Sequence, residues 1–205
     1  MQRRHVLLTT MAAASLWLTA CATGPADGGW TTLIDGDKGL ENWNQVGNAN
    51  WRAESGLIVA DKGSVSYLVS KQSYKDFAIR AEFWAATDTN SGIFVRLSDP
   101  KTITADNSYE VNIWDIRPDP KYGTGGIVGF AAVPVPPVFF AGGRWNTYEI
   151  EARGPVVTVK LNGAVTVTMN NDKFAAGPFA LQFGTGVQGV PGGPIKWRKV
   201  QIKVL

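Results

Sequence analysis

The chain has 205 residues, with 20 Lys and Arg against 17 Asp and Glu, a formal net charge of +3. Two of those cations, Arg3 and Arg4, lie in a leader described below; without them the charge is close to neutral, so we expect no nucleic-acid partner. With 23 Gly, 11 Pro and 44% hydrophobic residues, the composition is typical of a turn-rich β protein and excludes a coiled coil, a helical bundle and a disordered chain.

Residues 1–20 are predicted to be a secretion signal peptide. Arg3 and Arg4 give it a positive start, and residues 6–18 form an apolar stretch that is too short for a spanning helix. The stretch ends in the sequence LTAC at residues 18–21, which resembles the lipobox of bacterial lipoproteins. In those proteins the leader is cut before the cysteine and the thiol is acylated. The alternative is an ordinary signal peptide with a stray cysteine.

Cys21 is the single cysteine of the chain, which excludes an intramolecular disulfide and makes this residue the predicted lipidation site. Residues 21–29 would then be a short lipid-anchored tether that holds the protein at a membrane surface without a transmembrane segment. Ala22 follows the cysteine, as in lipoproteins sorted to the outer membrane. We therefore expect an exported, lipid-anchored protein of the bacterial cell envelope, facing the periplasm at the outer membrane.

Residues 30–205 are expected to form one all-β domain, because their apolar residues alternate with period two. The Asn162-Gly163 step between two apolar runs predicts a tight hairpin, and residues 171–176 could form one helical turn. Many short strands of this kind predict a β-sandwich or barrel. The predicted strands cover residues 78–84, 93–97, 109–114, 147–152, 156–161, 165–169, 179–183 and 196–204.

Residues 117–143 interrupt this pattern with five prolines, several glycines and four aromatic residues. A loop of this length is uncommon in a compact domain unless it is functional or disordered, and its aromatic residues favour an ordered loop. Two interpretations remain open: a wall or lid of a binding cleft, or a variable surface connection.

Alternation also separates each strand into an apolar face and a second face on which acids, amides, an arginine and aromatic rings are mixed. This mixture is typical of carbohydrate sites, in which rings stack on sugars and polar groups bind the hydroxyls. Neighbouring strands lie about 4.8 Å apart, so we expect these side chains to converge on one sugar; the alternative is a solvated sheet face. The candidates are Glu82, Trp84, Phe94, Arg96, Glu110, Asn112, Trp114 and Gln182.

We expect no cofactor and no catalytic histidine in the mature protein. His5, the one histidine, lies in the leader, which excludes Ser–His and Cys–His catalysis and histidine metal ligands. Asp35, Asp37 and Glu41 could form a calcium loop of carboxylates and carbonyls, but their spacing is not that of an EF-hand, and a plain turn is the alternative.

Several motifs, in this order, resemble those of the 3-keto-disaccharide hydrolase domain family and cover nearly all of residues 30–205. They are TLIDG and LENW at residues 32–36 and 40–43, NSGIFVR at 90–96, YEVNIWD at 109–115, RWNTYEI at 144–150, LNG at 161–163, GPFALQ at 177–182 and WRKVQI at 197–202. The resemblance implies a concanavalin-like jelly roll of two antiparallel sheets. It also implies cleavage of 3-keto-glycosides by elimination and hydration. Many members carry a histidine just after the Leu-Gln pair, where this chain has Phe183 and Gly184.

The candidate residues suggest a mechanism for such a cleavage. A retaining glycosidase needs two carboxyl groups about 5–5.5 Å apart, and the strand with Glu110 offers no second acid on that face. A 3-keto sugar needs only one base, because the ketone acidifies the C2 proton. We expect Glu110 to be that base, Arg96 to stabilise the enolate, and Glu82 or Asp115 to protonate the leaving oxygen.

In the same scheme the amides of Asn112 and Gln182 orient hydroxyls, while Trp84, Trp114 and Phe94 offer aromatic contacts. Two other functions remain open for the same residues. The domain could be a non-catalytic carbohydrate-binding module, or a structural envelope lipoprotein whose sheet contacts a partner protein.

Overall fold

The computed structural model describes residues 28–186 and 192–205, and this part of the chain is built almost entirely of strands. The predicted signal peptide, Cys21 and residues 22–27 of the tether lie outside the described residues. Within the described part, no helix has the length and apolar character needed to cross a membrane.

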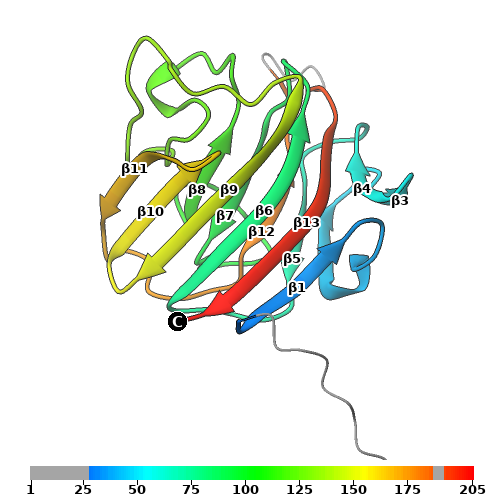
Figure 1. Cartoon of the computed structure of the whole chain (residues 1–205), viewed down its shortest axis with the longest axis horizontal. Coiled ribbons are helices and arrows are strands. Elements are labelled where there is room, and N and C mark those ends of the chain that lie inside the picture. Colours follow the sequence, from blue (N-terminus) through cyan, green and yellow to red (C-terminus); the bar gives the residue numbers. More distant parts are fainter. Residues whose placement is uncertain (1–27, 187–191) are drawn as a thin grey trace, which may run out of the picture.

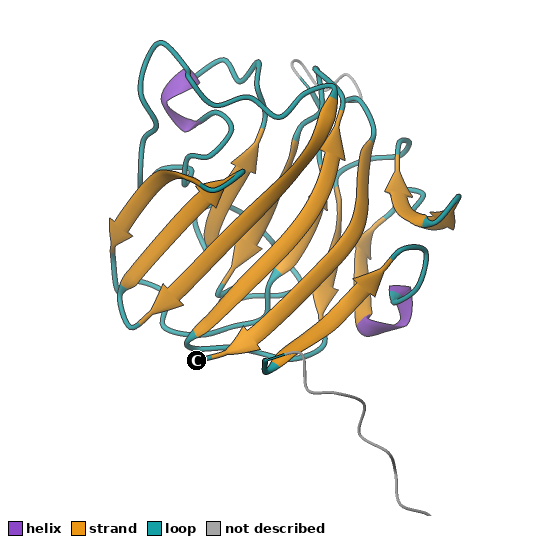
Figure 2. Cartoon of the chain, in the orientation of Figure 1, coloured by secondary structure: helices purple, strands orange, loops and turns teal. Residues whose placement is uncertain are grey.

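Two antiparallel sheets pack face to face, which confirms the predicted sandwich (Figures 1 and 2). Figure 1 views the larger sheet from outside, with the smaller sheet behind it. The larger sheet contains β1 (Trp30–Asp35), β3 (Arg52–Glu54), β4 (Leu57–Ala60), β6 (Phe77–Ala85), β9 (Arg144–Arg153), β10 (Val156–Leu161), β11 (Ala164–Asn170) and β13 (Ile195–Val204). The smaller sheet contains β2 (Trp43–Gly47), β5 (Ser66–Ser70), β7 (Ser91–Val95), β8 (Tyr109–Ile113) and β12 (Ala180–Phe183).

The order of strands decides which side chains can meet. In the larger sheet the order is β11-β10-β9-β6-β13-β4-β3, with β1 also paired to β13, and in the smaller sheet it is β2-β5-β12-β7-β8. Strand β6 therefore belongs to one sheet, whereas β7, β8 and β12 belong to the other. Two short 3-10 helices, η1 (Leu40–Asn42) and η2 (Pro120–Tyr122), lie in the connections.

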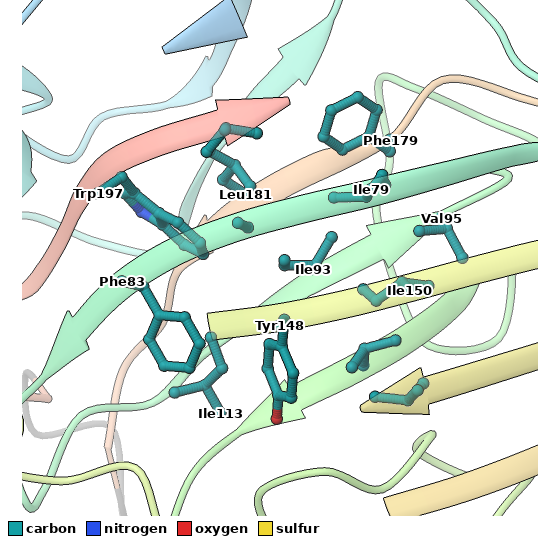
Figure 3. Close-up of a cluster of buried hydrophobic side chains, with 14 of the residues drawn as sticks. Ile79, Phe83, Ile93, Val95, Ile113, Tyr148, Ile150, Phe179, Leu181 and Trp197 are labelled. Atoms are coloured by element: carbon teal, nitrogen blue, oxygen red, sulfur yellow. The ribbon is translucent and has the colours of Figure 1, made fainter. Parts of the chain in front are cut away.

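The core fills the space between the sheets and follows the predicted alternation. Apolar side chains of both sheets interdigitate there, including Ile79, Phe83, Tyr148, Ile150 and Trp197 from the larger sheet and Ile93, Val95, Ile113, Phe179 and Leu181 from the region of the smaller sheet (Figure 3). Each of these side chains is at most 1% exposed. Their burial supplies the main driving force for folding.

The Asn162-Gly163 hairpin is confirmed. Both residues have positive φ angles, of 51° and 83°, and they join β10 to β11 with Leu161 opposite Ala164. Positive φ at both central positions is the geometry of a turn whose twist matches that of the strands, and asparagine and glycine adopt it most readily.

The remaining expectations about elements need correction. The five strands before residue 71 were not among the predicted ones; several of them are short, and β5 is buried on both faces, so period two is hard to detect there. Residues 171–176 contain no helical turn.

The loop at residues 117–143 is ordered and attached to the smaller sheet. Its segment 125–128 runs along β8: Val128 N donates to Glu110 O, and Asn112 N donates to Gly126 O, both at 3.0 Å. The ring of Phe130 packs 5.1 Å from that of Tyr109, so this aromatic residue anchors the loop, as predicted. Figure 2 shows the loop with its short helix beyond the end of the strands.

Candidate functional site

The outer face of the smaller sheet carries the candidate site, and we call it the Glu110 face. Its side chains point away from the main core and form two rows across the sheet. One row contains Val46, Tyr67, Gln182, Gly92 and Asn112, and the other contains Asn44, Val69, Ala180, Phe94 and Glu110. Strand pairing therefore places Glu110 beside Phe94, with Gly92 and Asn112 in the next row.

Glu110 is the unusual group on this face. Only 7% of the residue is exposed, and no described residue donates a hydrogen bond to its carboxylate. Burial raises the pKa of Glu110 from its ordinary 4.5 to about 7, because a charge is poorly solvated there, and the positive charge of Arg117 opposes this shift. A carboxyl group with a pKa near neutrality can both accept and return a proton at physiological pH.

Gln182 and Gly92 are the neighbours of Glu110 in the adjacent row. The side-chain Oε1 of Gln182 is buried and has no partner among the described residues, while its Nε2 lies 3.5 Å from the hydroxyl of Tyr67. A Cβ atom at Gly92 would lie 3.5 Å from Glu110 Cγ and 3.6 Å from Gln182 Oε1. The same Cβ would lie 3.0 Å from Val111 O, so Gly92 is packed closely between the amide oxygen of Gln182 and the carboxylate of Glu110, neither of which has a partner among the described residues.

Tyr67 lies beside Gln182 on the same face. Its hydroxyl donates to the backbone oxygen of Ile103 at 3.3 Å, and its ring packs edge-on against Phe94 at 5.3 Å. Burial, and to a lesser extent the charge of Glu110, raise the pKa of Tyr67, while the hydrogen bond with Gln182 lowers it. The connection between β7 and β8 thus covers the middle of the face. Phe94, only 1% exposed, is too deeply covered to stack on a ligand.

Asn112 and Trp114 lie under the other cover, the loop at residues 117–143. The Asn112 side chain is fully buried; its Nδ2 donates to Tyr122 O at 2.6 Å, and its Oδ1 has no partner among the described residues. Trp114 follows directly after β8 and is half-buried, with its Nε1 also unpartnered. Glu110 therefore lies between two covers, with buried polar atoms on both sides.

Glu82 and Trp84 are not part of this site. They alternate as predicted, but they belong to β6 and so lie on the outer face of the larger sheet, on the opposite side of the sandwich. Glu82 forms an ion pair with Arg198 at 2.5 Å, and Lys196 lies 4.6 Å from the centre of the Trp84 ring. The expectation that these residues converge with Glu110 is corrected, because alternation assigns a face of a strand and not the sheet to which the strand belongs.

Arg96 is also absent from the site. Strand β7 ends at Val95, and Arg96 has a φ of 55°, so the alternation stops before this residue. Its guanidinium is only 1% exposed and donates to backbone oxygens of Lys75, Gly154 and Phe174. The predicted enolate-stabilising role is therefore corrected: Arg96 holds three chain segments together at one end of the sandwich.

Asp115 is positioned as an acceptor rather than as a free acid. Its carboxylate accepts hydrogen bonds from the Thr124 hydroxyl at 2.6 Å and from the backbone amides of Ala141 and Gly142. These contacts tie Thr124 and the far end of the loop to the end of β8. The geometry favours a role in holding the loop, in place of the predicted proton donation.

The acidic turn at residues 35–41 has a simple structural explanation. Asp35 and Lys38 exchange two backbone hydrogen bonds of 3.2 Å, which closes a tight turn after β1. Across residues 28–186 and 192–205, no group of three or more His, Cys, Asp or Glu side chains is placed to hold a metal ion.

A groove of about 660 Å³ hollows the same outer face near β2 and β5. Its apolar part includes Val46, Val69 and Leu97, and Lys71 and Lys101 line it as well. Val69 lies in the row that ends at Glu110, with Ala180 and Phe94 between them. The groove is separated from Glu110 by the cover that Ile103 forms over Phe94.

Sequence reasoning missed Tyr67, Gly92 and Arg117. Tyr67 lies in a strand buried on both faces, which gives no alternation, and a glycine carries no side-chain signal. Arg117 was included only as part of the loop. Its spacing of three residues from Trp114 was a usable signal, because a tight turn after the strand brings such residues together.

The comparisons with known proteins agree with this fold. A family model described as 3-keto-alpha-glucoside-1,2-lyase-like domain matches residues 29–203. A crystal structure of a proposed glycosyl hydrolase from Parabacteroides distasonis superposes with a TM-score of 0.67 at 25% identity, covering 86% of this chain and 99% of that one. The search of curated proteins found no match.

Two Bacillus subtilis structures resemble the chain in fold alone. A carbohydrate-binding module has a TM-score of 0.56 at 16% identity, covering 85% of this chain and 95% of that one. A protein with a galectin-like fold has a TM-score of 0.61 at 8% identity, covering 83% and 93% respectively. The jelly-roll architecture predicted from the sequence is therefore confirmed.

Proposed function

Because the chain belongs to the family of 3-keto-alpha-glucoside-1,2-lyase-like domains, we propose that its carbohydrate-related role is the cleavage of 3-keto-glycosides at Glu110. The observation that carries this proposal is the buried carboxyl group of Glu110, which has a pKa of about 7 and no hydrogen-bond donor among the described residues. The unpartnered side-chain oxygen of Gln182 on the same face supports it, since a hydroxyl group of a sugar can donate to such an oxygen.

Elimination followed by hydration needs only one base of this kind. Glu110 takes the proton from C2, which the neighbouring ketone acidifies, and an enolate forms. The bond from C1 to the leaving oxygen then breaks, and the proton held by Glu110 is available for that oxygen. Water adds across the resulting double bond, so the net reaction is hydrolysis. A single carboxyl group serves both proton transfers, which is consistent with Glu82 and Asp115 being engaged elsewhere.

The variant Glu110→Gln tests the catalytic part of this proposal. We expect its turnover of a 3-keto-disaccharide to fall by at least about 100-fold, because general-base catalysis is lost, while binding persists. Product analysis after incubation with a 3-keto-disaccharide, and with an ordinary disaccharide, gives the turnover; calorimetry gives the binding. Glu82→Gln is the matched control, since this residue lies on the opposite face of the sandwich, and it should leave both values unchanged. Turnover by Glu110→Gln at the wild-type rate contradicts the assignment.

A carbohydrate-binding module is the second candidate function. Phe183 and Gly184 stand where many family members carry a histidine, and no second free carboxylate lies beside Glu110 among the described residues. A module of this kind would bind the sugar with the same oxygen atoms. Binding without products in the same incubation would favour it, and neither binding nor products would favour a structural protein that contacts a partner.

We also propose that the mature chain is anchored in the cell envelope through acylated Cys21. The lipobox-like residues 18–21 support this proposal, together with the short tether that follows them. We expect mass spectrometry of the membrane fraction to find a mature chain that begins at a lipid-modified Cys21. A free thiol at this residue would contradict the anchor.

A further inference from the structure

Arg117 lies at the edge of the Glu110 face, although it begins a long loop. Alternation along β8 gives Glu110, Asn112 and Trp114 the same orientation, so Trp114 extends that face past the end of the strand. The chain then turns back, with Arg117 N donating to Trp114 O at 3.4 Å. As a result, the Arg117 guanidinium carbon lies 5.5 Å from the centre of the Trp114 ring. Stacking of this kind holds a cation over an aromatic ring.

The turn that carries Arg117 is held on both sides. Trp114 N donates to the Thr124 hydroxyl at 3.0 Å, and that hydroxyl donates to Asp115. Asp115 also binds the far end of the loop through Ala141 and Gly142. The guanidinium is therefore positioned before any ligand arrives, which lowers the cost of using it in binding.

Arg117 has no carboxylate partner among the residues that the structure describes. It forms none of the ion pairs found among the described residues, and its Nε is buried without an acceptor. A buried donor of this kind is costly unless a ligand satisfies it. The positive charge of Arg117 nevertheless acts on Glu110 and lowers its pKa against the effect of burial.

Arg117 is the one charged group among the described residues that shifts the pKa of Glu110; the connection between β7 and β8 carries Asp99, Lys101 and Asp106, and none of these is among the causes of the shift. Strand β7 contributes Gly92 and Phe94, the segment 125–128 contains no ionisable side chain, and β5 contributes the neutral hydroxyl of Tyr67. Lys121, the next cation in the loop, pairs with Asp119 at 3.4 Å.

We propose that Arg117 is the cation of the Glu110 site and that it donates its unpartnered Nε–H to a ligand oxygen that becomes negatively charged. This inference rests on the proposed function for the identity of that oxygen, which is the ketone oxygen of a 3-keto sugar as the enolate forms. Arg117 thus takes the role that the sequence suggested for Arg96. Its effect on Glu110 is a property of the free protein and does not depend on any substrate.

The test replaces the cation and follows Glu110 directly. The variant is Arg117→Gln, and the control is Lys121→Gln, which removes one positive charge from an exposed position in the same loop. Titration of ¹³C-labelled glutamate carboxyl groups by NMR measures the pKa of Glu110 in the free proteins, with Glu110→Gln assigning the resonance. We expect Arg117→Gln to raise this pKa above its wild-type value, whereas Lys121→Gln should leave it unchanged.

Kinetics with a 3-keto-disaccharide test the second part. We expect Arg117→Gln to lower kcat/KM by about 100-fold and to move the acidic limb of the pH profile upward, with partial rescue by Arg117→Lys. An unshifted Glu110 titration in Arg117→Gln overturns the inference, whatever the activity. If the wild-type protein turns over no 3-keto-glycoside, the proposed function and the enolate contact both fail, and the titration alone then decides whether Arg117 sets the charge of Glu110.

Discussion

Arg96 contributes to stability through backbone contacts. Its guanidinium bridges three segments that are far apart in the sequence, with N···O distances of 2.7 Å to Lys75, 2.8 Å to Gly154 and 3.2 Å to Phe174. Its left-handed backbone conformation turns the side chain to the end of the sandwich instead of to a face. A buried charge of this kind is stabilising only while its hydrogen bonds are satisfied.

Replacement of Arg96 should therefore affect folding and not the site. We expect Arg96→Met to lower the free energy of unfolding by about 3 kcal/mol, because the carbonyl groups of Lys75, Gly154 and Phe174 lose the donor that joins their three segments, and the bond to Phe174 is buried. Urea denaturation measures this change. Arg198→Met removes an arginine whose ion pair with Glu82 is partly exposed to solvent, and it should cost less than about 1 kcal/mol. Equal effects of the two substitutions would contradict the structural role of Arg96.

At the scale of the elements, the loop at residues 117–143 works as part of the smaller sheet. Its backbone pairs with β8 and so satisfies an edge that would otherwise be free to pair with another chain. Asn112 and Asp115 add side-chain contacts to the same loop, at Tyr122 and Ala141. Residues expected to touch a sugar instead hold the cover of the site, and Arg117 emerges from that cover.

Alternation predicted the buried faces of the long strands because the period of two is a local property. The apolar residues at the expected core positions of β6, β7, β8 and β12 face the core, whereas Phe94 and Ala180 lie on the outer face. Strand pairing is not local, however, and the sequence alone does not tell that β6 lies in a different sheet from β8. This explains why Glu110 and Gln182 were correctly placed on one face, while Glu82 was placed there wrongly.

The positions of loop residues were harder still to predict from the sequence. Arg96 left the expected face because one residue adopts a positive φ, which the sequence does not indicate for an arginine. The place of Arg117 depends on a turn and on contacts made by Asp115 with residues more than 20 positions away. Such contacts exist only once the tertiary structure has formed.

At the scale of the whole molecule, the site is a source of instability. The folded chain buries Glu110 in a place where its charge is poorly solvated, and the rest of the sandwich must offset this cost. Glu110 binds its proton more tightly in the folded state than in the unfolded state. This tighter proton binding stabilises the folded state fully below about pH 4.5, and the stabilisation is lost as the pH rises through about 7.

Comparison of the wild type with Glu110→Gln at several pH values measures this cost. A shift from 4.5 to about 7 corresponds to about 3 kcal/mol, so the neutral variant should be more stable than the wild type by up to that amount at pH 8. Near pH 4 the two should differ little, since Glu110 is then protonated in both states. Denaturant unfolding measures the difference in the free energy of unfolding between the two proteins at each pH. The contributions of the other titrating groups cancel in this difference. Glu41→Gln, at an exposed position, is the control substitution. A difference that does not grow between pH 4 and pH 8 would mean that Glu110 is not held in a poorly solvated site, and the acid–base role proposed for it would lose its physical basis.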